Sequence, residues 1–143
     1  MRKFKILVVD DDVNLTFLLQ QRLEKEGFQV ATAHDVPDGV RAYRSFIPDL
    51  VLTDVSMGKE SGFDLMRRIR HHFADVEAIY MTGDISVHQL ALQEERRTHY
   101  VSVLAKPFSG RDLLEAVVAR AQSKQRFTTS RAPGGRRRPT AQL

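Results

Sequence analysis

The chain has 143 residues, 42% of them hydrophobic and 28% charged, as expected for one globular domain large enough to bury its own core. It contains no cysteine, which excludes a disulfide framework, a thiolate metal site and a cysteine nucleophile. The apolar run Ile6–Val9 near the start is too short for a membrane span or a signal peptide. We therefore expect a soluble, cytoplasmic protein that does not insert into a membrane.

The formal net charge of +4 is concentrated at one end of the chain. Residues 1–126 hold 18 basic and 18 acidic side chains, whereas residues 127–143 hold four arginines and no acid. The last segment is interrupted by proline and glycine and has no hydrophobic periodicity. We expect a folded domain over 1–126 and a disordered basic tail over 127–143. Such a tail can contact nucleic acid, an acidic protein or a membrane surface, or have no function, and nucleic acid is not expected to bind the domain itself.

Short apolar runs alternate with amphipathic segments along residues 1–126. Five strands are predicted from the runs, at 5–9, 28–31, 49–53, 77–82 and 100–105. Five helices are predicted after them, at 13–26, 35–46, 61–72, 84–97 and 109–124. In the first helix the spacing places Val13, Phe17 and Gln20 on one face, broadened by neighbouring leucines. The final helix is expected to turn Leu113 and Val117 inward.

Continuous apolar strands separated by helices predict a parallel sheet that is covered on both faces. With right-handed crossovers this becomes a doubly wound α/β fold with five strands. In such sheets, functional sites lie beyond the carboxyl ends of the strands. Polar residues follow four of the five predicted strands there: Asp10, Asp11 and Asp12 after the first, Asp54 after the third, Thr82 after the fourth and Lys106 after the fifth.

These residue types together indicate phosphoryl chemistry at a metal site. Neighbouring carboxylates repel one another unless a cation lies among them, and Mg²⁺ prefers oxygen ligands. A carboxylate can attack phosphorus, while a hydroxyl and a lysine hold the phosphoryl oxygens. Other functions of α/β proteins are excluded by their missing motifs, because the chain has no G-x-G-x-x-G, no G-x-x-x-x-G-K-[ST] and no G-x-S-x-G.

The four strand-end segments, taken together and in order, resemble the receiver domain of two-component response regulators over about residues 4–124. The segments are Ile6–Asp12, Leu50–Met57, Tyr80–Gly83 and Lys106–Phe108. The resemblance implies a flavodoxin-like fold with strand order 2-1-3-4-5, which is known for the chemotaxis member of this family. It also implies a signalling domain rather than an enzyme, switched by phosphorylation from a histidine kinase or a phosphotransfer protein.

The resemblance implies a role for each matching residue. Asp54 is the expected phospho-acceptor, and Thr82 and Lys106 are expected to contact the phosphoryl group. The expected Mg²⁺ ligands are Asp10, Asp11, Asp54 and the backbone carbonyl of Ser56. The Lys106–Pro107 peptide bond is expected to be cis. Asp12 is expected to cap a helix rather than to bind metal.

Two positions depart from the family pattern. The proline that usually follows Met57 is replaced by Gly58, which we expect to loosen the loop. The aromatic residue that usually lies three positions before the lysine is replaced by Val103, and Tyr100 is out of register with it. A valine cannot swing inward to fill the space behind the threonine, so we expect an unusual route from the site to the output surface.

Several functions remain open from the sequence. The domain can be a monomer or weak dimer whose phosphorylation changes its binding to an unknown output partner. Alternatively, it can be the N-terminal module of a longer transcriptional or enzymatic regulator. It can also be an interaction module that no longer uses phosphate, as Val103 and Gly58 suggest. An aspartyl-phosphate phosphatase is disfavoured because Ser56 stands where such enzymes carry a second acid.

Overall fold

The computed structural model describes residues 2–130. Its large sheet has five strands, β1 (Lys5–Val9), β2 (Gln29–Ala33), β3 (Leu50–Asp54), β6 (Glu77–Thr82) and β7 (Val101–Ala105). The helices are α1 (Val13–Lys25), α2 (Val36–Phe46), α3 (Gly62–Arg70), α4 (Gln89–Thr98) and α5 (Gly110–Ser130). A small hairpin of β4 (Ser56–Met57) and β5 (Glu60–Ser61) lies between β3 and α3.

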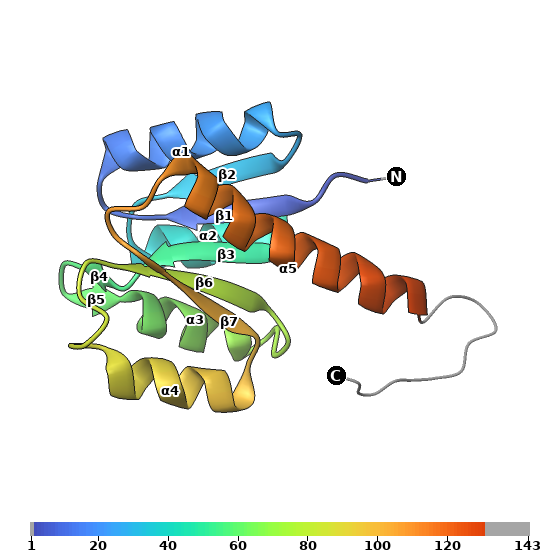
Figure 1. Ribbon diagram of the computed structural model, residues 1–143. Coiled ribbons are helices and arrows are strands. Elements are labelled where there is room, and N and C mark those ends of the chain that lie inside the picture. The colour runs from blue at the N-terminus through green and yellow to red at the C-terminus, as the bar shows by residue number, and fades with distance from the viewer. Residues whose placement is uncertain (1, 131–143) are drawn as a thin grey trace.

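All neighbouring strands of the large sheet are parallel, in the order β2-β1-β3-β6-β7 (Figure 1). Because β6 and β7 are the fourth and fifth strands of this sheet, the predicted order 2-1-3-4-5 is confirmed. The carboxyl ends of β1, β3 and β6 therefore lie next to one another. The first residues after these strands are brought together although they are far apart in the sequence.

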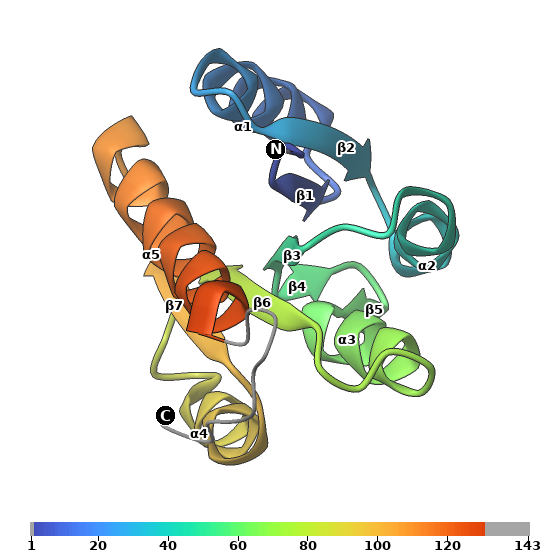
Figure 2. The ribbon, with the colours of Figure 1, turned by 90° about the vertical axis from the view of Figure 1, so that its right-hand side faces the viewer.

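Helices lie on both faces of the sheet (Figure 2), and a hydrophobic core lies on each side of it. Alternate residues of each strand point to opposite faces, so Leu7 and Val9 belong to one core and Ile6 and Val8 to the other. The first core is closed by α2, α3 and α4, and the second by α1 and α5. Strands buried on both faces explain why the sequence shows unbroken apolar runs.

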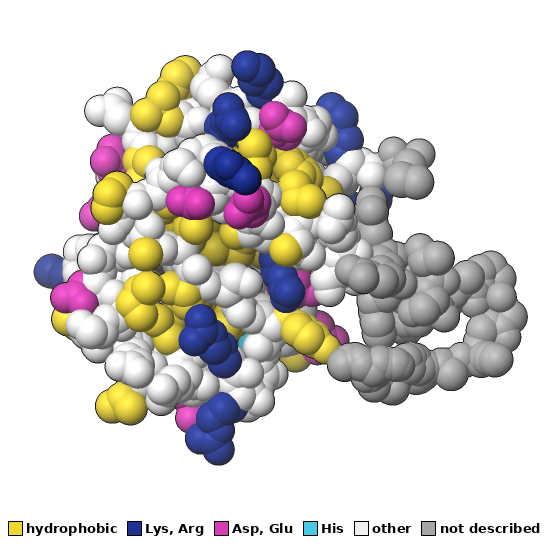
Figure 3. Space-filling model, in the orientation of Figure 1, with side chains coloured by type: hydrophobic (Ala, Val, Ile, Leu, Met, Phe, Trp, Pro, Cys, Tyr) yellow, Lys and Arg dark blue, Asp and Glu magenta, His cyan; other side chains and the backbone are white. Residues whose placement is uncertain are grey.

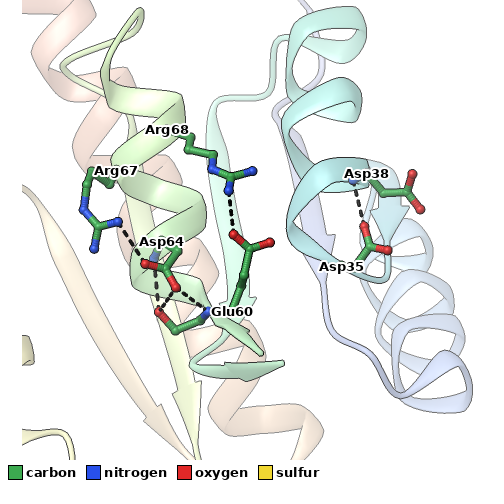
Figure 4. A network of polar contacts seen from close by, with 7 residues as sticks. Asp35, Asp38, Glu60, Asp64, Arg67 and Arg68 are labelled. Atoms are coloured by element: carbon green, nitrogen blue, oxygen red, sulfur yellow. Dashed lines mark hydrogen bonds and ion pairs between the residues drawn. The ribbon is translucent and has the colours of Figure 1, made fainter. Parts of the chain in front are cut away.

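Side-chain caps fix where four helices begin, including α5, where Ser109 accepts a hydrogen bond from the backbone N–H of Asp112. Asp12 accepts a hydrogen bond from the backbone N–H of Leu15, which confirms its expected role as the cap of α1. Asp35 caps α2 in the same way. At α3, Ser61 and Asp64 form a reciprocal capping box, and Arg68 on the helix pairs with Glu60 of β5 (Figure 4). The hairpin and the start of α3 are thus joined.

A second polar cluster lies at the amino edge of the sheet, around the buried carboxylate of Asp49. Asp49 accepts hydrogen bonds from the guanidinium of Arg2, at 2.6 and 3.1 Å, and from the backbone N–H of Lys5 at 2.8 Å. Lys124 of α5 lies 3.6 Å from the same carboxylate. Burial raises the pKa of Asp49, but these hydrogen bonds and charges outweigh it and leave the pKa below its ordinary value.

Two helices differ from their predicted bounds by more than two residues. The helix predicted from residue 84 begins at Gln89, because the carboxylate of Asp84 accepts hydrogen bonds from Ser86 and Val87 and forms a turn instead. The last helix continues to Ser130 rather than ending at Lys124. The helix therefore includes residues 127–130 of the expected tail, and residues 131–143 lie outside the described part of the chain.

The first helix also faces differently from the expectation. Val13 and Phe17 are solvent-exposed, with 60% and 57% of their surface accessible, and the buried residues are Thr16, Leu19 and Leu23. A helix with apolar residues on most of its faces does not define its core-facing side by spacing alone. The final helix turns Leu113 and Val117 into the core as expected.

On the face that carries α1 and α5, basic and acidic side chains are interspersed (Figure 3). This matches the equal numbers of acids and bases in residues 1–126 and does not indicate a binding surface of one charge sign. Within the described residues, no helix is long and apolar enough to cross a membrane.

Candidate functional site

Three carboxylates meet at the carboxyl edge of the sheet, in the part of the chain predicted to carry the chemistry. Asp10 and Asp11 follow β1, and Asp54 ends β3. One carboxylate oxygen from each of the three lies within 4.8 Å of the others. Asp10 is buried and Asp11 exposed, and the side chain of Asp54 is 11% exposed. The cluster therefore forms a shallow acidic site that a ligand can reach from solvent.

Lys106 supplies the positive charge of this site. Its Nζ donates to Asp10 Oδ2 at 3.0 Å and lies 3.3 Å from Asp54 Oδ1. The Lys106–Pro107 peptide bond is cis, as predicted. The backbone N–H of Lys106 donates to the carbonyl of Thr82 at 2.7 Å, which fixes the end of β7 against the end of β6.

Burial and neighbouring charges shift the pKa values of both Asp54 and Lys106. Burial raises the pKa of Asp54, the negative charge of Asp10 raises it further, and Lys106 offsets only part of this effect. For Lys106, burial lowers the pKa, but contacts with Asp10 and Asp54 outweigh it and leave the pKa raised. The ammonium therefore stays charged, while the carboxylates retain an uncompensated repulsion that favours binding of a cation.

Thr82 lies at the same edge, at the end of β6, and is buried. Its hydroxyl oxygen accepts a hydrogen bond from the backbone N–H of Asp84 at 3.1 Å. The hydroxyl therefore holds the turn that leads from β6 to α4. Ser56 lies two residues beyond Asp54, at the start of β4, and its backbone carbonyl remains a predicted metal ligand.

Two glycines shape the loop behind Asp54. A Cβ atom on Gly62 would lie 2.3 Å from the backbone carbonyl oxygen of Asp54, so only glycine allows this close approach. Sequence reasoning missed Gly62, and only its place directly after the capping residue Ser61 was a signal. Gly58 has a φ of +72° at the first loop position of the β4–β5 hairpin, the geometry of a type II′ turn. The expectation that Gly58 loosens this loop is thus incomplete, because it also satisfies the turn.

The donor set fits a hard divalent cation. Carboxylate oxygens of Asp10, Asp11 and Asp54 are the ligands that Mg²⁺ prefers, and the close approach of three acids provides the charge. When bound, such an ion would neutralise the site and polarise phosphoryl oxygens. The arrangement of a nucleophilic carboxylate, a lysine and a hydroxyl at one edge is suited to accepting a phosphoryl group.

Comparison with known proteins agrees with this geometry. The chain matches the family described as the response regulator receiver domain over residues 6–118. It is 35% identical to the transcriptional regulatory protein CpxR of Klebsiella pneumoniae over 130 residues, which cover 87% of this chain and 54% of that protein. It is 34% identical to the C4-dicarboxylate transport transcriptional regulatory protein DctD of Pseudomonas aeruginosa over 113 residues, which cover 79% of this chain and 24% of that protein.

Solved structures give the same result. A response regulator receiver domain protein from Clostridium thermocellum superposes with a TM-score of 0.74 at 31% identity, covering 85% of this chain and 97% of that chain. NtrX from Brucella abortus superposes with a TM-score of 0.75 at 28% identity, covering 90% of this chain and 29% of that chain. The chain belongs to the family of response regulator receiver domains. It spans about half, or less, of the length of these curated relatives.

Proposed function

We propose that this receiver domain accepts a phosphoryl group on Asp54 in a Mg²⁺-dependent reaction. The single observation that supports this most is the cluster of three carboxylates with Lys106 placed between Asp10 and Asp54. Mg²⁺, held by Asp10, Asp11, Asp54 and the carbonyl of Ser56, would neutralise the site for an anionic donor.

The residues of the chain then have separate tasks. A carboxylate oxygen of Asp54 attacks phosphorus, the bond from phosphorus to the donor's imidazole nitrogen breaks, and its electron pair returns to the imidazole. The product is an acyl phosphate. Lys106, already 3.3 Å from Asp54, places its positive charge beside the oxygens of the transferred group. The Thr82 hydroxyl can turn from the Asp84 N–H to a phosphoryl oxygen.

The donor we propose is a histidine kinase or a phosphotransfer protein. It must approach the carboxyl edge of the sheet, where α1 begins directly after the acidic residues. Val13, Phe17 and Leu18 of α1 are exposed apolar side chains next to this edge. They offer a contact surface for the donor while its phosphohistidine reaches Asp54.

The output surface that we propose for the phosphorylated domain includes α4 and β7. Ile85, Val87 and Leu90 around the start of α4, and Tyr100 before β7, are exposed apolar residues. Because curated relatives of about twice this length are transcriptional regulators, we also propose that the domain acts as the N-terminal module of such a regulator. A phosphate-independent interaction module, suggested by Val103, is the second candidate.

The test is phosphorylation by acetyl phosphate with Mg²⁺, followed by intact mass measurement. We expect one phosphoryl adduct on the wild-type chain and none on Asp54→Asn or without Mg²⁺. Binding of beryllofluoride, a mimic of the phosphoryl group, distinguishes rapid hydrolysis from failure to react. If neither an adduct nor beryllofluoride binding is detected, the phosphate-independent module replaces this proposal.

A further inference from the structure

An aromatic residue lies near Thr82 on β6, whereas the family usually carries one on the strand that is β7 here. Val103 of β7 is aligned in register with Tyr80 of β6, and paired side chains of parallel strands point to the same face. Tyr80 is also two residues before Thr82 on the same strand, so both lie on the face covered by α3 and α4. An aromatic ring is therefore present next to Val103, although position 103 itself carries none.

The ring of Tyr80 is fully buried, and its hydroxyl makes a polar contact with α4. The hydroxyl donates to Oε1 of Glu95 at 2.6 Å. Nη1 of Arg70, on α3, donates to the same carboxylate oxygen. Burial raises the pKa of Tyr80, and the negative charge of Glu95 raises it further, so the phenol remains a hydrogen-bond donor. Side chains from β6, α3 and α4 thus converge on one oxygen atom.

The triad Arg70–Tyr80–Glu95 joins α4 to α3 and to β6. Leu92 is the only residue of α4 that is buried, and Leu90 is 82% exposed. His88, the residue before the first turn of α4, makes no side-chain capping hydrogen bond. With so little apolar burial, the position of α4 depends on the Glu95 contact and on the turn that precedes the helix.

The turn before α4 is held at its start by Thr82. The hydroxyl of Thr82 holds the N–H of Asp84, so its rotation toward a phosphoryl group on Asp54 would release the start of this turn. The turn ends at His88, whose ring lies 6.2 Å from the ring of Phe63. Phe63 in turn packs on Tyr80, with 4.7 Å between ring centroids. A continuous set of contacts therefore connects the phosphorylation site with both ends of α4.

We propose that the Arg70–Tyr80–Glu95 triad is the latch that holds α4 in its unphosphorylated position, and that phosphorylation of Asp54 must overcome it. Tyr80 is a positioning residue in this scheme and does not touch the phosphoryl group. The inference rests on the proposed function, because it assigns the regulation of that same site. In this scheme Tyr80 takes the role that Val103 cannot fill in the route from the site to the output surface.

The latch has a defined effect on ligand affinity. Some ligands bind only the conformation that the phosphorylated domain adopts. Their apparent Kd rises as the populated fraction of that conformation falls. Breaking the latch populates it more often. Loss of a hydrogen bond to a charged carboxylate is expected to tighten beryllofluoride binding by about tenfold in Tyr80→Phe, which removes only the hydroxyl.

The experiment compares Tyr80→Phe with Tyr43→Phe, in the full chain with Mg²⁺. Tyr43 is also a buried tyrosine, on α2, and its ring packs on Phe73 away from α4. We expect Tyr80→Phe to bind beryllofluoride about tenfold more tightly than wild type, and Tyr43→Phe to bind like wild type. Glu95→Gln, which weakens the acceptor from the other side, should act in the same direction as Tyr80→Phe.

A second readout separates a latch from a purely structural contact. In NMR spectra without beryllofluoride, the α4 amides of Tyr80→Phe should lie on the line between the free and beryllofluoride-bound positions of wild type. A structural contact alone would lower the melting temperature but leave the affinity unchanged and move the amides off that line. Unchanged affinity in both Tyr80→Phe and Glu95→Gln, with wild type binding normally, overturns the latch alone. Failure of wild type to bind overturns the proposed function and the latch together.

Discussion

The contact between Gly62 and Asp54 can be tested by adding a single methyl group. Gly62→Ala would place a Cβ atom 2.3 Å from the carbonyl oxygen of Asp54 and 3.1 Å from two side-chain atoms of Thr53. Neither the Asp54 carbonyl nor the start of α3 can move without breaking other contacts. The Asp54 carbonyl already accepts a hydrogen bond from the Thr53 hydroxyl at 3.0 Å, and the start of α3 is fixed by its capping box.

The size of the effect follows from this distance. Real Cβ atoms are essentially never found closer than 3.0 Å to a backbone atom, so α3 and β3 must separate by close to an ångström. Overpacking of this kind costs about 2 kcal/mol, which lowers the melting temperature of a domain of this size by roughly 8 °C. Displacement of the nucleophile by a similar distance can slow the reaction by as much as about a hundredfold.

The assay has two parts and a matched control. Thermal unfolding by circular dichroism measures the first effect, and the rate of adduct formation with acetyl phosphate and Mg²⁺ measures the second. Gly110→Ala is the control, because a Cβ there meets only the flexible end of Arg22, at 3.2 Å. It should unfold and react like wild type.

A Gly62→Ala protein with the melting temperature and reaction rate of wild type would refute this reasoning. It would mean that β3 and α3 separate without cost, and that the close approach is not required. A loss of stability with an unchanged rate would show that α3 moves while Asp54 stays in place.

Three further predictions concern charge and turn geometry. Mg²⁺ should stabilise wild type by about 2.7 kcal/mol at a hundredfold excess over its Kd, which is seen as a higher melting temperature. It should have much less effect on Asp54→Asn, although that protein should be the more stable of the two without Mg²⁺. An equal Mg²⁺ effect on both proteins would contradict the metal site. Asp49→Asn should cost about 1 to 2 kcal/mol at pH 7 in urea unfolding. Because the pKa of Asp49 is lowered in the folded state, this contribution to stability is present above the ordinary pKa of 3.8 and is lost as the pH falls through the lower pKa of the folded state. A stability difference between wild type and Asp49→Asn that persists below that pH would contradict this account. Gly58→Pro, which restores the usual residue of the family, should destabilise the domain by more than about 1 kcal/mol, since proline cannot adopt a φ of +72°; wild-type stability in urea would show that the turn can rearrange.

The sheet and most of the site could be predicted from the sequence for one physical reason. Strands buried on both faces appear as apolar runs such as Ile6–Val9, and parallel strands bring the residues after them to a common edge. Asp10, Asp54 and Lys106 could therefore be grouped although they are 44 and 52 residues apart in the chain. The structure brings these three together as expected.

Features that depend on tertiary contacts were not visible in the sequence. The β4–β5 hairpin has strands of two residues, too short for a periodic pattern. The role of Gly62 depends on a backbone from another element. The start of α4 depends on competition between a cap and a turn at Asp84. The Glu95 contact joins residues that look like ordinary surface charges until the fold brings them beside Tyr80.

The cluster around Asp49 has a consequence for how the domain is connected to its surroundings. One carboxylate holds both the beginning of the chain, through Arg2 and Lys5, and the last helix, through Lys124. Figure 1 shows the start of β1 and the end of α5 on the side away from β4 and β5, which lie next to the proposed phosphorylation site. A phosphodonor and a segment attached to α5 would therefore occupy opposite ends of the molecule. Because that segment lies away from the acidic edge, it does not block a phosphodonor from reaching Asp54.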